Sequence, residues 1–198
     1  MNRLALFFAL LFLFSSVSLG QGTGGHNILK NSDFERFSGD TPTGWESTNI
    51  PGMLTLVSRS SQSHGGKSSV KCEVKDFYGT KMAGMLCLKD VKVSGISLTL
   101  NGFYLLRSVG KDVGFFSIAF KNAQASAVGS VEESLSKSSS EYIPFTKTVP
   151  IPEGTTNLDI HLTLLSGAES GNLHEGSYAL FDDIELIASA ESIETTEP

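Results

Sequence analysis

Positive charge is scarce in this 198-residue sequence: 15 lysine and arginine residues stand against 21 aspartate and glutamate residues, for a formal net charge of −6. This balance disfavours nucleic acid as a partner, because binding to phosphate groups requires a basic surface. Charge of either sign is sparse, at 18% of residues, whereas glycine is frequent, at 20 residues. Few charges and many glycines are typical of a β protein with many turns.

A long apolar run is lacking except near the N-terminus, where Leu4–Phe14 follows Met1-Asn2-Arg3 and precedes the small-residue end Ser18-Leu19-Gly20. This order is the signal-peptide pattern, with cleavage expected after Gly20. The run is too short to span a bilayer comfortably, which takes about 20 residues. An uncleaved membrane anchor is the alternative. We expect a secreted or periplasmic protein with no transmembrane segment after cleavage.

Cysteine is also scarce, with only Cys72 and Cys87. In an oxidising compartment an even pair suggests one disulfide, and two buried free thiols are the alternative. A hairpin that places Cys72 opposite Cys87 would allow the bond, whereas a one-residue slip would put the two side chains on opposite faces. The predicted export favours the disulfide.

A sustained helical period is absent, and about nine runs of strand character are present instead, separated by turn signals. The best helical candidate, Val131–Lys137, is short and weakly amphipathic, so we interpret it as a loop or one helical turn. The nine predicted strands are Asn27–Glu35, Met53–Arg59, Ser68–Lys75, Lys81–Lys89, Ile96–Arg107, Val113–Lys121, Tyr142–Val149, Asn157–Leu165 and Ser177–Ile187.

Several of these strands alternate between apolar and polar residues. Three rows are expected in the core: Leu158, Ile160, Leu162 and Leu164; Gly114, Phe116, Ile118 and Phe120; and Ile96, Leu98, Leu100, Tyr104 and Leu106. Period-two alternation buries one face of each strand, as antiparallel sheets usually do. We predict one all-β domain over residues 27–187, after a flexible leader at 21–26 and before an acidic, disordered tail at 188–198.

Motifs at the two ends of this domain are related to a known family. The first is Asn27-Ile28-Leu29-Lys30-Asn31-Ser32-Asp33-Phe34-Glu35, followed by Pro42-Thr43-Gly44-Trp45, and the last is Tyr178-Ala179-Leu180-Phe181-Asp182-Asp183-Ile184-Glu185-Leu186. Together they resemble the jelly-roll carbohydrate-binding modules of the galactose-binding-like superfamily, with Ser32 in place of the usual glycine. The resemblance implies a jelly-roll β-sandwich of two sheets, with its first and last strands side by side.

A carboxylate in the last strand needs a partner. The parity of Asp182 matches that of Tyr178, Leu180, Ile184 and Leu186, which places it on an apolar face, and a buried carboxylate is costly unless it is paired, hydrogen-bonded or metal-bound. The resemblance implies a structural calcium ion, an oxygen-seeking cation. Its implied ligands are the side chains of Glu35 and Asp182, with backbone oxygens of nearby loop residues such as Asp33. Hydrogen bonds from turn amides or a lysine partner are the alternatives.

A saccharide site requires aromatic rings and fixed polar groups. The outward parity of the central strands offers six residues: Asn101, Phe103, Arg107, Phe115, Asp159 and His161. If their strands share one sheet, Phe103, Phe115 and His161 line a concave platform for a poly- or oligosaccharide. Alternatively, a loop such as Val131–Glu141 covers both phenylalanines, or they belong to an oligomer contact. Trp45 is expected to pack under the first loop.

Chemistry-bearing motifs are absent: the sequence has no Gly-x-Ser-x-Gly elbow, no zinc-ligand spacing and no phosphate loop. His161 and Arg107 could share a face, as in jelly-roll lyases, but no characteristic motif accompanies them. We predict a non-catalytic, carbohydrate-binding protein. One alternative is a secreted structural or adhesive β-sandwich that binds protein partners, and another is a polysaccharide lyase or glycoside hydrolase on the same fold.

Overall fold

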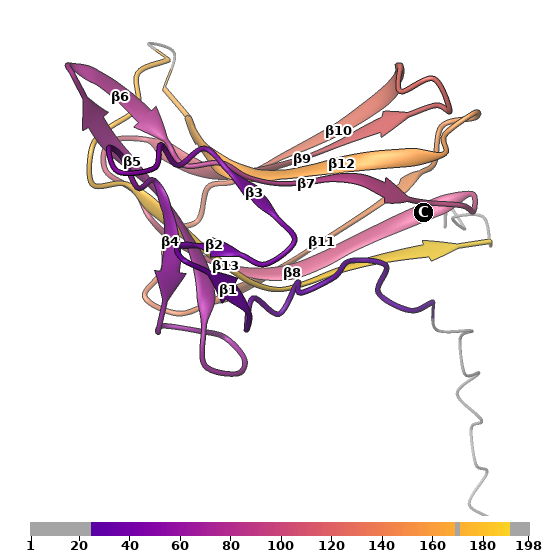
Figure 1. Ribbon diagram of the computed structural model, residues 1–198, viewed down its shortest axis with the longest axis horizontal. Helices are drawn as coiled ribbons and strands as arrows, with labels where there is room; N and C mark the ends of the chain where they lie inside the picture. Colours follow the sequence, from indigo (N-terminus) through magenta and orange to yellow (C-terminus); the bar gives the residue numbers. More distant parts are fainter. Residues whose placement is uncertain (1–24, 169–170, 191–198) are drawn as a thin grey trace, which may run out of the picture.

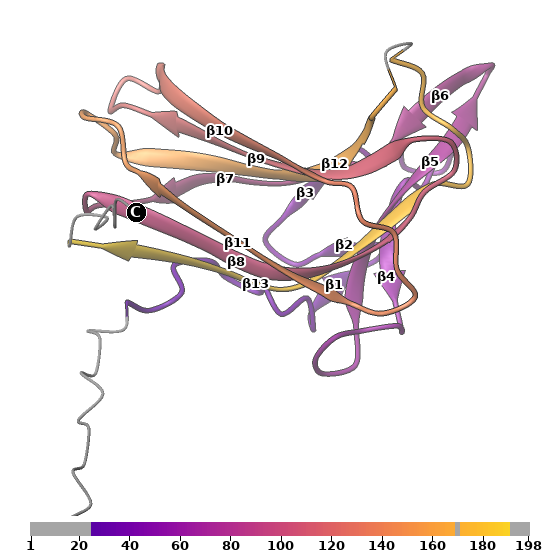
Figure 2. The ribbon, with the colours of Figure 1, turned by 180° about the vertical axis from the view of Figure 1, so that it is seen from behind.

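Two antiparallel sheets pack face to face in the computed structural model of this chain, which describes residues 25–168 and 171–190 (Figures 1 and 2). The five-stranded sheet has the order β10 (Ala127–Leu135), β9 (Asp112–Lys121), β12 (Asn157–Ser166), β7 (Leu86–Lys92), β3 (Glu46–Ser47). The six-stranded sheet has the order β11 (Ile143–Pro150), β8 (Ser97–Arg107), β13 (Tyr178–Ser189), β5 (Ser69–Phe77), β4 (Val57–Ser60). β6 (Thr80–Ala83) pairs with β5, and β1 (Phe37–Ser38) pairs with β2 (Thr41–Pro42).

The predicted all-β sandwich is confirmed, but the described residues form thirteen strands where about nine were expected. One reason is that the predicted run Lys81–Lys89 is divided between the two sheets as β6 and β7. The chain crosses between them at Gly84, where an added Cβ atom would collide with the carbonyl oxygen of Leu56. Only glycine permits so close an approach of two backbones.

The interpretation of Val131–Lys137 as a loop or helical turn is wrong, because most of this segment lies in the edge strand β10. Its alternation was hidden by Glu133, which has the same parity as Val131 and Leu135. The Glu133 carboxylate lies 2.8 Å from the ammonium group of Lys147 on β11, in the other sheet. An inward-pointing charge of this kind is a usual feature of edge strands, where it discourages pairing with other chains.

The prediction of a strand over Asn27–Glu35 is also wrong, since this segment makes only an isolated bridge between Asn27 and Ile187. Positive φ angles at Asn31 and Phe34 bend the chain away from extended geometry. The chain ends nevertheless meet as expected, because the amide of Ile28 donates to the carbonyl of Leu186 at 2.9 Å.

The core lies between the sheets and contains the predicted rows of β8, β9 and β12, which are at most 4% exposed at Leu98, Leu100, Tyr104, Leu106, Phe116, Ile118, Phe120, Leu158, Ile160, Leu162 and Leu164. Ile96 is an exception: it precedes β8 and is 48% exposed. Trp45 packs under the first loop as predicted, with its ring 5.3 Å from that of Phe34 and its indole N–H donating to the carbonyl of Lys30. This contact confirms that Trp45 is a core residue.

The segments predicted as signal peptide (1–20) and most of the leader and acidic tail lie outside the described residues. Strand β13 continues to Ser189, two residues beyond the predicted domain end at 187. In residues 25–168 and 171–190, we find no helix of the length and apolarity that a membrane span would require.

The predicted disulfide is contradicted, because Cys72 and Cys87 are both free, buried thiols. Cys72 lies on β5 and pairs with Val57 and Ala179 in the six-stranded sheet. Cys87 lies on β7 in the five-stranded sheet, opposite His161. The hairpin that would have brought them together does not form, since β5 pairs with β6 and the chain then leaves the sheet.

We therefore expect two titratable thiols per chain when the protein is unfolded in guanidinium chloride without reductant. In the folded protein they should react slowly, because burial raises the pKa of Cys72 to about 12 and that of Cys87 to about 11, and the thiolate is the reactive form. An Ellman titration with a pre-reduced sample as the control measures both quantities. No titratable thiol in the unreduced sample would contradict the arrangement.

Candidate functional site

A β-bulge at the Asp182-Asp183 pair organises the outer face of the six-stranded sheet. The step from Asp182 to Glu185 on β13 is three residues long, whereas the opposite step from Phe103 to Asn101 on β8 is two residues long. Asp183 absorbs the extra residue with a φ of 47°. Bulges of this kind re-aim the side chains that follow them. Asp182 therefore faces outward, on the side opposite to the core.

The bulge corrects the predicted face of Asp182. Before the bulge, Tyr178 and Leu180 share its outward side; after it, Ile184 and Leu186 turn into the core, at 1% and 0% exposure. A strict period of two had placed all five residues on one face. Asp182 is still fully buried, at 0% exposure, because the loop of residues 61–68 folds over it.

Two carboxylates hold this loop by its backbone amides. Asp182 accepts hydrogen bonds from the amides of His64, at 2.7 Å, and Gly65, at 3.2 Å. Glu35 accepts from the amides of Lys67, at 2.7 Å, and Ser68, at 2.8 Å. We call this set of four bonds the amide clamp. It contains the turn amides that the alternative interpretation expected as partners of the buried carboxylate.

The two carboxyl groups of the clamp have opposite pKa shifts. Burial raises the pKa of Asp182 to about 6, against the lowering effect of its amide partners. The amides of Lys67 and Ser68 lower the pKa of Glu35, because hydrogen bonds to a carboxylate favour its charged form. The neighbouring Asp183 carboxylate lies 2.7 Å from the Nδ1 atom of His64. The loop is thus held by three acidic side chains.

The amide clamp occupies one oxygen of each of the two carboxylates that the predicted calcium shell would use. Calcium takes six to eight oxygen ligands, whereas amide hydrogens point at the oxygens of Glu35 and Asp182 here. Asp33 is exposed, and the described ranges contain no group of three or more His, Cys, Asp or Glu side chains that could hold a metal ion. Calcium at Glu35, Asp182 and Asp33 stays an untested prediction of the family resemblance.

The clamped loop covers part of the outer face of β8. The His64 ring stacks on the ring of Phe103, with centroids 3.4 Å apart and planes 12° apart. Tyr142 closes the other side, donating its hydroxyl to the carbonyl of Gln62 at 2.7 Å. Phe103 is therefore covered by a loop, as the alternative interpretation held, although the covering loop is 61–68. Asn101, on the same face, accepts a hydrogen bond from Thr146.

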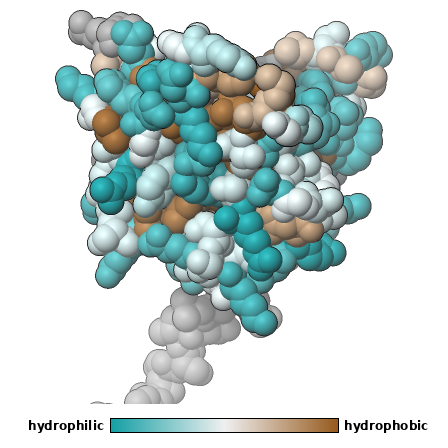
Figure 3. All heavy atoms as spheres, turned by 60° about the vertical axis from the view of Figure 1, so that its left-hand side comes forward, coloured by the Kyte–Doolittle hydropathy of each residue, from teal (hydrophilic) through white to brown (hydrophobic). Residues whose placement is uncertain are grey.

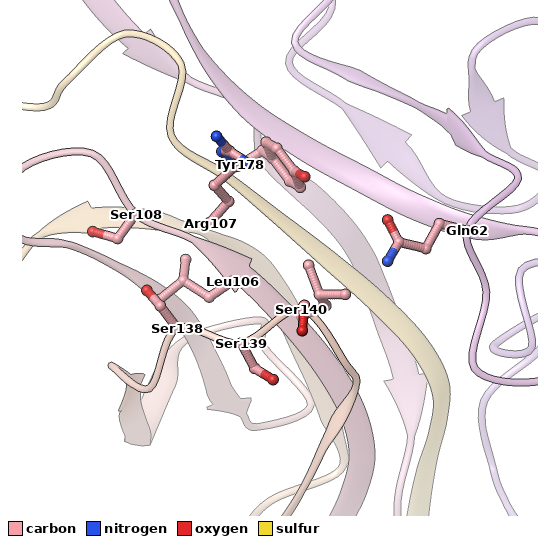
Figure 4. Close-up of a pocket in the computed structure, with 9 residues that line it drawn as sticks. Gln62, Leu106, Arg107, Ser108, Ser138, Ser139, Ser140 and Tyr178 are labelled. Carbon is pink, nitrogen blue, oxygen red and sulfur yellow. The ribbon is translucent and has the colours of Figure 1, made fainter.

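A pocket of about 550 Å³ lies on this face beside the clamped loop (Figure 4). Its floor comes from the end of β8 and the start of β13, where Arg107 pairs with Tyr178. Gln62 of the clamped loop lines one side, and the segment Ser138–Ser140, which connects β10 to β11, lines the other. The pocket combines the guanidinium of Arg107, the amide of Gln62, the phenol ring of Tyr178 and the hydroxyls of four serines.

The outer face of the five-stranded sheet carries the other predicted residues. Phe115 and His161 lie on neighbouring strands and are both half-buried. His161 Nδ1 lies 3.3 Å from the Ser117 hydroxyl, and Asp159 lies 2.8 Å from the ammonium group of Lys121. The sheet is curved, and this face forms the concave upper side of the molecule, between the β5–β6 and β9–β10 hairpins (Figure 1).

The predicted platform of Phe103, Phe115 and His161 does not form, because it required their strands to belong to one sheet. Asn101, Phe103 and Arg107 lie on the six-stranded sheet, whereas Phe115, Asp159 and His161 lie on the five-stranded sheet. Alternation gives the outward parity of a strand but not the sheet to which it belongs. The candidate residues therefore divide into a concave face around Phe115 and His161 and a pocket around Arg107.

Several residues of these sites were missed by sequence reasoning. Gln62 and Ser138–Ser140 are ordinary loop residues whose positions depend on loop folding, and no sequence signal marks them. Lys121 could have been found, since it shares the outward parity of Phe115 and Ser117.

The surface at the end of the sandwich is mixed, with apolar residues between hydrophilic ones (Figure 3). Tyr78, Val109 and Leu165 are among the exposed apolar side chains of the molecule.

A second hollow, of about 1540 Å³, lies between residues 25–30, 88–96 and 151–156. It contains none of the nine residues proposed from the sequence as ligand or metal contacts. Its wall includes Gly25, the first residue that the structure describes. We therefore place the candidate site on the two outer faces.

Because burial raises the pKa of Asp182, stability should depend on pH in a defined window. The folded state binds this proton more tightly than the unfolded state, with a pKa of about 6 against an ordinary value of 3.8. The stabilisation is thus complete below pH 4 and is lost as the pH rises through 6, with a size on the order of 3 kcal/mol.

Urea unfolding of the wild type and of Asp182→Asn, between pH 4.5 and 7.5, measures this dependence. The free energy of unfolding of the wild type should fall relative to that of the variant as the pH rises, because asparagine does not titrate. Asp33→Asn is the matched control for an exposed aspartate near the clamp. A constant difference between wild type and Asp182→Asn across this range would contradict the effect of burial.

Thermal unfolding with and without calcium separates the amide clamp from a calcium site. We expect the same Tm after exhaustive treatment with EGTA as in excess calcium chloride, because amide hydrogens already satisfy the carboxylates. A Tm that rises in calcium for the wild type but not for Asp182→Asn would overturn this expectation. That result would establish the calcium ion that the family resemblance implies.

No protein-family model matches this sequence, and no curated protein matches it. Solved structures do match. The CBM22-1 xylan-binding domain of Paenibacillus barcinonensis Xyn10C is 13% identical, with a TM-score of 0.53, over 86% of this chain and 99% of that domain. TmCBM61, solved in complex with β-1,4-galactotriose, is 16% identical, with a TM-score of 0.53, over 82% and 99%.

Enzymes share this fold as well. A cyclase from Fischerella sp. TAU is 14% identical, with a TM-score of 0.60, over 83% of this chain and 97% of that one. The match to the enzymatically active domain of tailspike protein 4 of bacteriophage CBA120 spans only 21% of that chain. The similar structures are mainly carbohydrate-binding modules. The chain thus has the jelly-roll fold of carbohydrate-binding modules, in agreement with the resemblance seen in its end motifs.

Proposed function

We propose that this chain is a secreted, non-catalytic protein that binds a poly- or oligosaccharide on the outer face of its five-stranded sheet. The observation that carries the proposal is the concave face on which Phe115 and His161 lie on adjacent strands. Saccharide sites combine an aromatic ring, which packs against sugar C–H groups, with polar groups fixed in a concave surface. The similar modules that bind xylan and galactotriose support this proposal.

The aromatic part of the face is Phe115. Its neighbours across the sheet are Ser134 on β10 and Thr163 on β12, both small and polar. The ring is half-buried at its base between these neighbours. A flat apolar ring between small hydroxyl-bearing residues offers room for a sugar ring above it.

The polar part of the face is an ion-paired cluster. Lys121 lies 2.8 Å from Asp159 and 3.0 Å from Asp90, and Asp159 also accepts the amide of Asp90 at 2.9 Å. The hydrogen bond to Asp159 is the main cause that raises the pKa of Lys121. The mutual pairing holds these groups in place while leaving one positive and two negative charges. Such fixed donors and acceptors suit the hydroxyls of an uncharged sugar.

A non-catalytic role is supported by the separation of the groups that a lyase would need. His161 lies on the five-stranded sheet and Arg107 on the six-stranded sheet, so the two cannot act on one substrate. His161 and Arg107, which the sequence allowed to share a face, therefore lie on different faces. The enzymes with this fold mean that the fold by itself does not decide the question.

Export is supported by the signal-peptide pattern of residues 1–20. Two free cysteines are compatible with an oxidising compartment, because both are buried in separate sheets and neither can meet the other.

Substitution of Phe115 by alanine should weaken saccharide binding roughly three- to tenfold, which corresponds to the loss of one aromatic contact. Affinity gels with β-glucan, xylan, mannan and galactan identify the ligand, and isothermal titration then measures the Kd. Phe103→Ala on the opposite face is the matched control and should bind as the wild type does.

Failure of all four polysaccharides to retard the wild-type protein would count against the proposal. It would favour the alternative of a structural or adhesive β-sandwich that binds protein partners. Equal weakening by Phe103→Ala and Phe115→Ala would show that the concave face is not the site.

A further inference from the structure

The pocket around Arg107 has a composition that the proposed saccharide face does not share. It lies on the outer side of the other sheet, and its polar lining consists of Gln62, Arg107, Ser108, Ser138, Ser139, Ser140 and Tyr178. Within residues 25–168 and 171–190, the guanidinium of Arg107 makes no hydrogen bond or ion pair. Arg107 therefore has no counter-ion among the described residues, although the chain as a whole carries a net negative charge.

Three of the acidic groups near this pocket, Glu73, Asp182 and Asp183, are already engaged. Glu73, two strands across the sheet from Arg107, lies 2.6 Å from the ammonium group of Lys71 and 2.8 Å from that of Lys75. Asp183 lies beside His64, and Asp182 is occupied by amides of the clamped loop. Glu141 is exposed next to the serine segment. These acidic side chains do not neutralise the Arg107 guanidinium, which can therefore bind an external anion.

The hydroxyl side of the pocket is ordered by backbone contacts. The amide of Ser139 donates to the carbonyl of Leu106 on β8, and its hydroxyl accepts the amide of Glu141 at 3.0 Å. These bonds hold the segment against the sheet, with the side chains of Ser138 and Ser140 exposed. On the opposite side, Gln62 is fixed through its carbonyl, which accepts the hydroxyl of Tyr142.

We infer that this pocket binds the carboxylate of a uronic acid unit of an acidic saccharide. The planar guanidinium of Arg107 matches a carboxylate, which it can bind through two parallel hydrogen bonds. A volume of about 550 Å³ is larger than an inorganic anion requires and accommodates a sugar ring. The serine hydroxyls and the Gln62 amide supply partners for ring hydroxyls, and the Tyr178 ring supplies an apolar surface.

This site is independent of the saccharide face in the proposed function. The two sites lie on opposite outer sides of the sandwich, and no residue belongs to both. Binding of uronate therefore survives loss of Phe115, and binding of a neutral saccharide survives loss of Arg107.

Isothermal titration with trigalacturonate tests the inference, with its fully methyl-esterified form as the uncharged probe and sodium sulfate as the inorganic anion. The wild type binds trigalacturonate and binds the ester at least tenfold more weakly, since hydrogen bonds to a charged group are lost. R107Q loses at least tenfold in affinity for trigalacturonate, while R36Q, which removes an exposed arginine elsewhere, binds as the wild type does. F115A also binds as the wild type does.

Four results would overturn the inference. They are no binding of trigalacturonate by the wild type at millimolar concentration, equal affinity for the ester, unchanged affinity in R107Q, and displacement of the trisaccharide by an equal concentration of sulfate. Displacement by sulfate would show that the pocket holds an adventitious ion only and does not recognise the sugar. R107K, which keeps the charge but not the planar fork, provides the second variant if R107Q does not fold, and its affinity lies between those of wild type and R107Q.

Discussion

Burial of one apolar row from each long strand between the two sheets is the constraint on which the rest of this structure depends. The rows of β8, β9 and β12 are almost completely excluded from water, and burial of this kind is the dominant favourable term in folding. Once these rows face inward, the alternate residues must face outward. The positions available for ligands are therefore a consequence of core packing, and the outer faces carry the polar and aromatic groups that the core cannot hold.

The bulge at Asp182-Asp183 is the one place where the last strand departs from this alternation. It lets Ile184 and Leu186 enter the core while Asp182 remains outside it. The amide of Ile184 then donates to the carbonyl of Ser32, which ties the strand to the N-terminal segment. The same bulge places the carboxylate that holds loop 61–68, and this loop forms one side of the Arg107 pocket. A local irregularity of one strand thus shapes a site on the sheet surface.

The two outer faces have different chemistry because different strands supply them. The five-stranded face carries an ion-paired cluster as well as Phe115, so its charges largely satisfy one another. On the six-stranded face, Asp182, Asp183 and Glu73 are engaged by amides, a histidine and lysines, and the guanidinium of Arg107 has no partner in the described residues. One fold can thereby present a hydroxyl-binding surface and an anion-binding pocket at once, as expected when function resides in sites on a common scaffold.

The sequence by itself determined the fold class, the inward rows of the long strands and the meeting of the two ends, because alternation and end motifs are local or directly paired features. It also marked Trp45 as core and Asp182 as a carboxylate that needs a partner. Only the tertiary structure decided which sheet each strand joins, and therefore that Phe103 and Phe115 lie on opposite outer sides. The pairing of a strand depends on contacts far away in the chain, and the same parity fits either sheet. The same reason explains why Cys72 and Cys87 lie in different sheets, why Glu133 of β10 points inward to Lys147, and why the amide clamp forms. Each of these features arises between separate segments of the sequence.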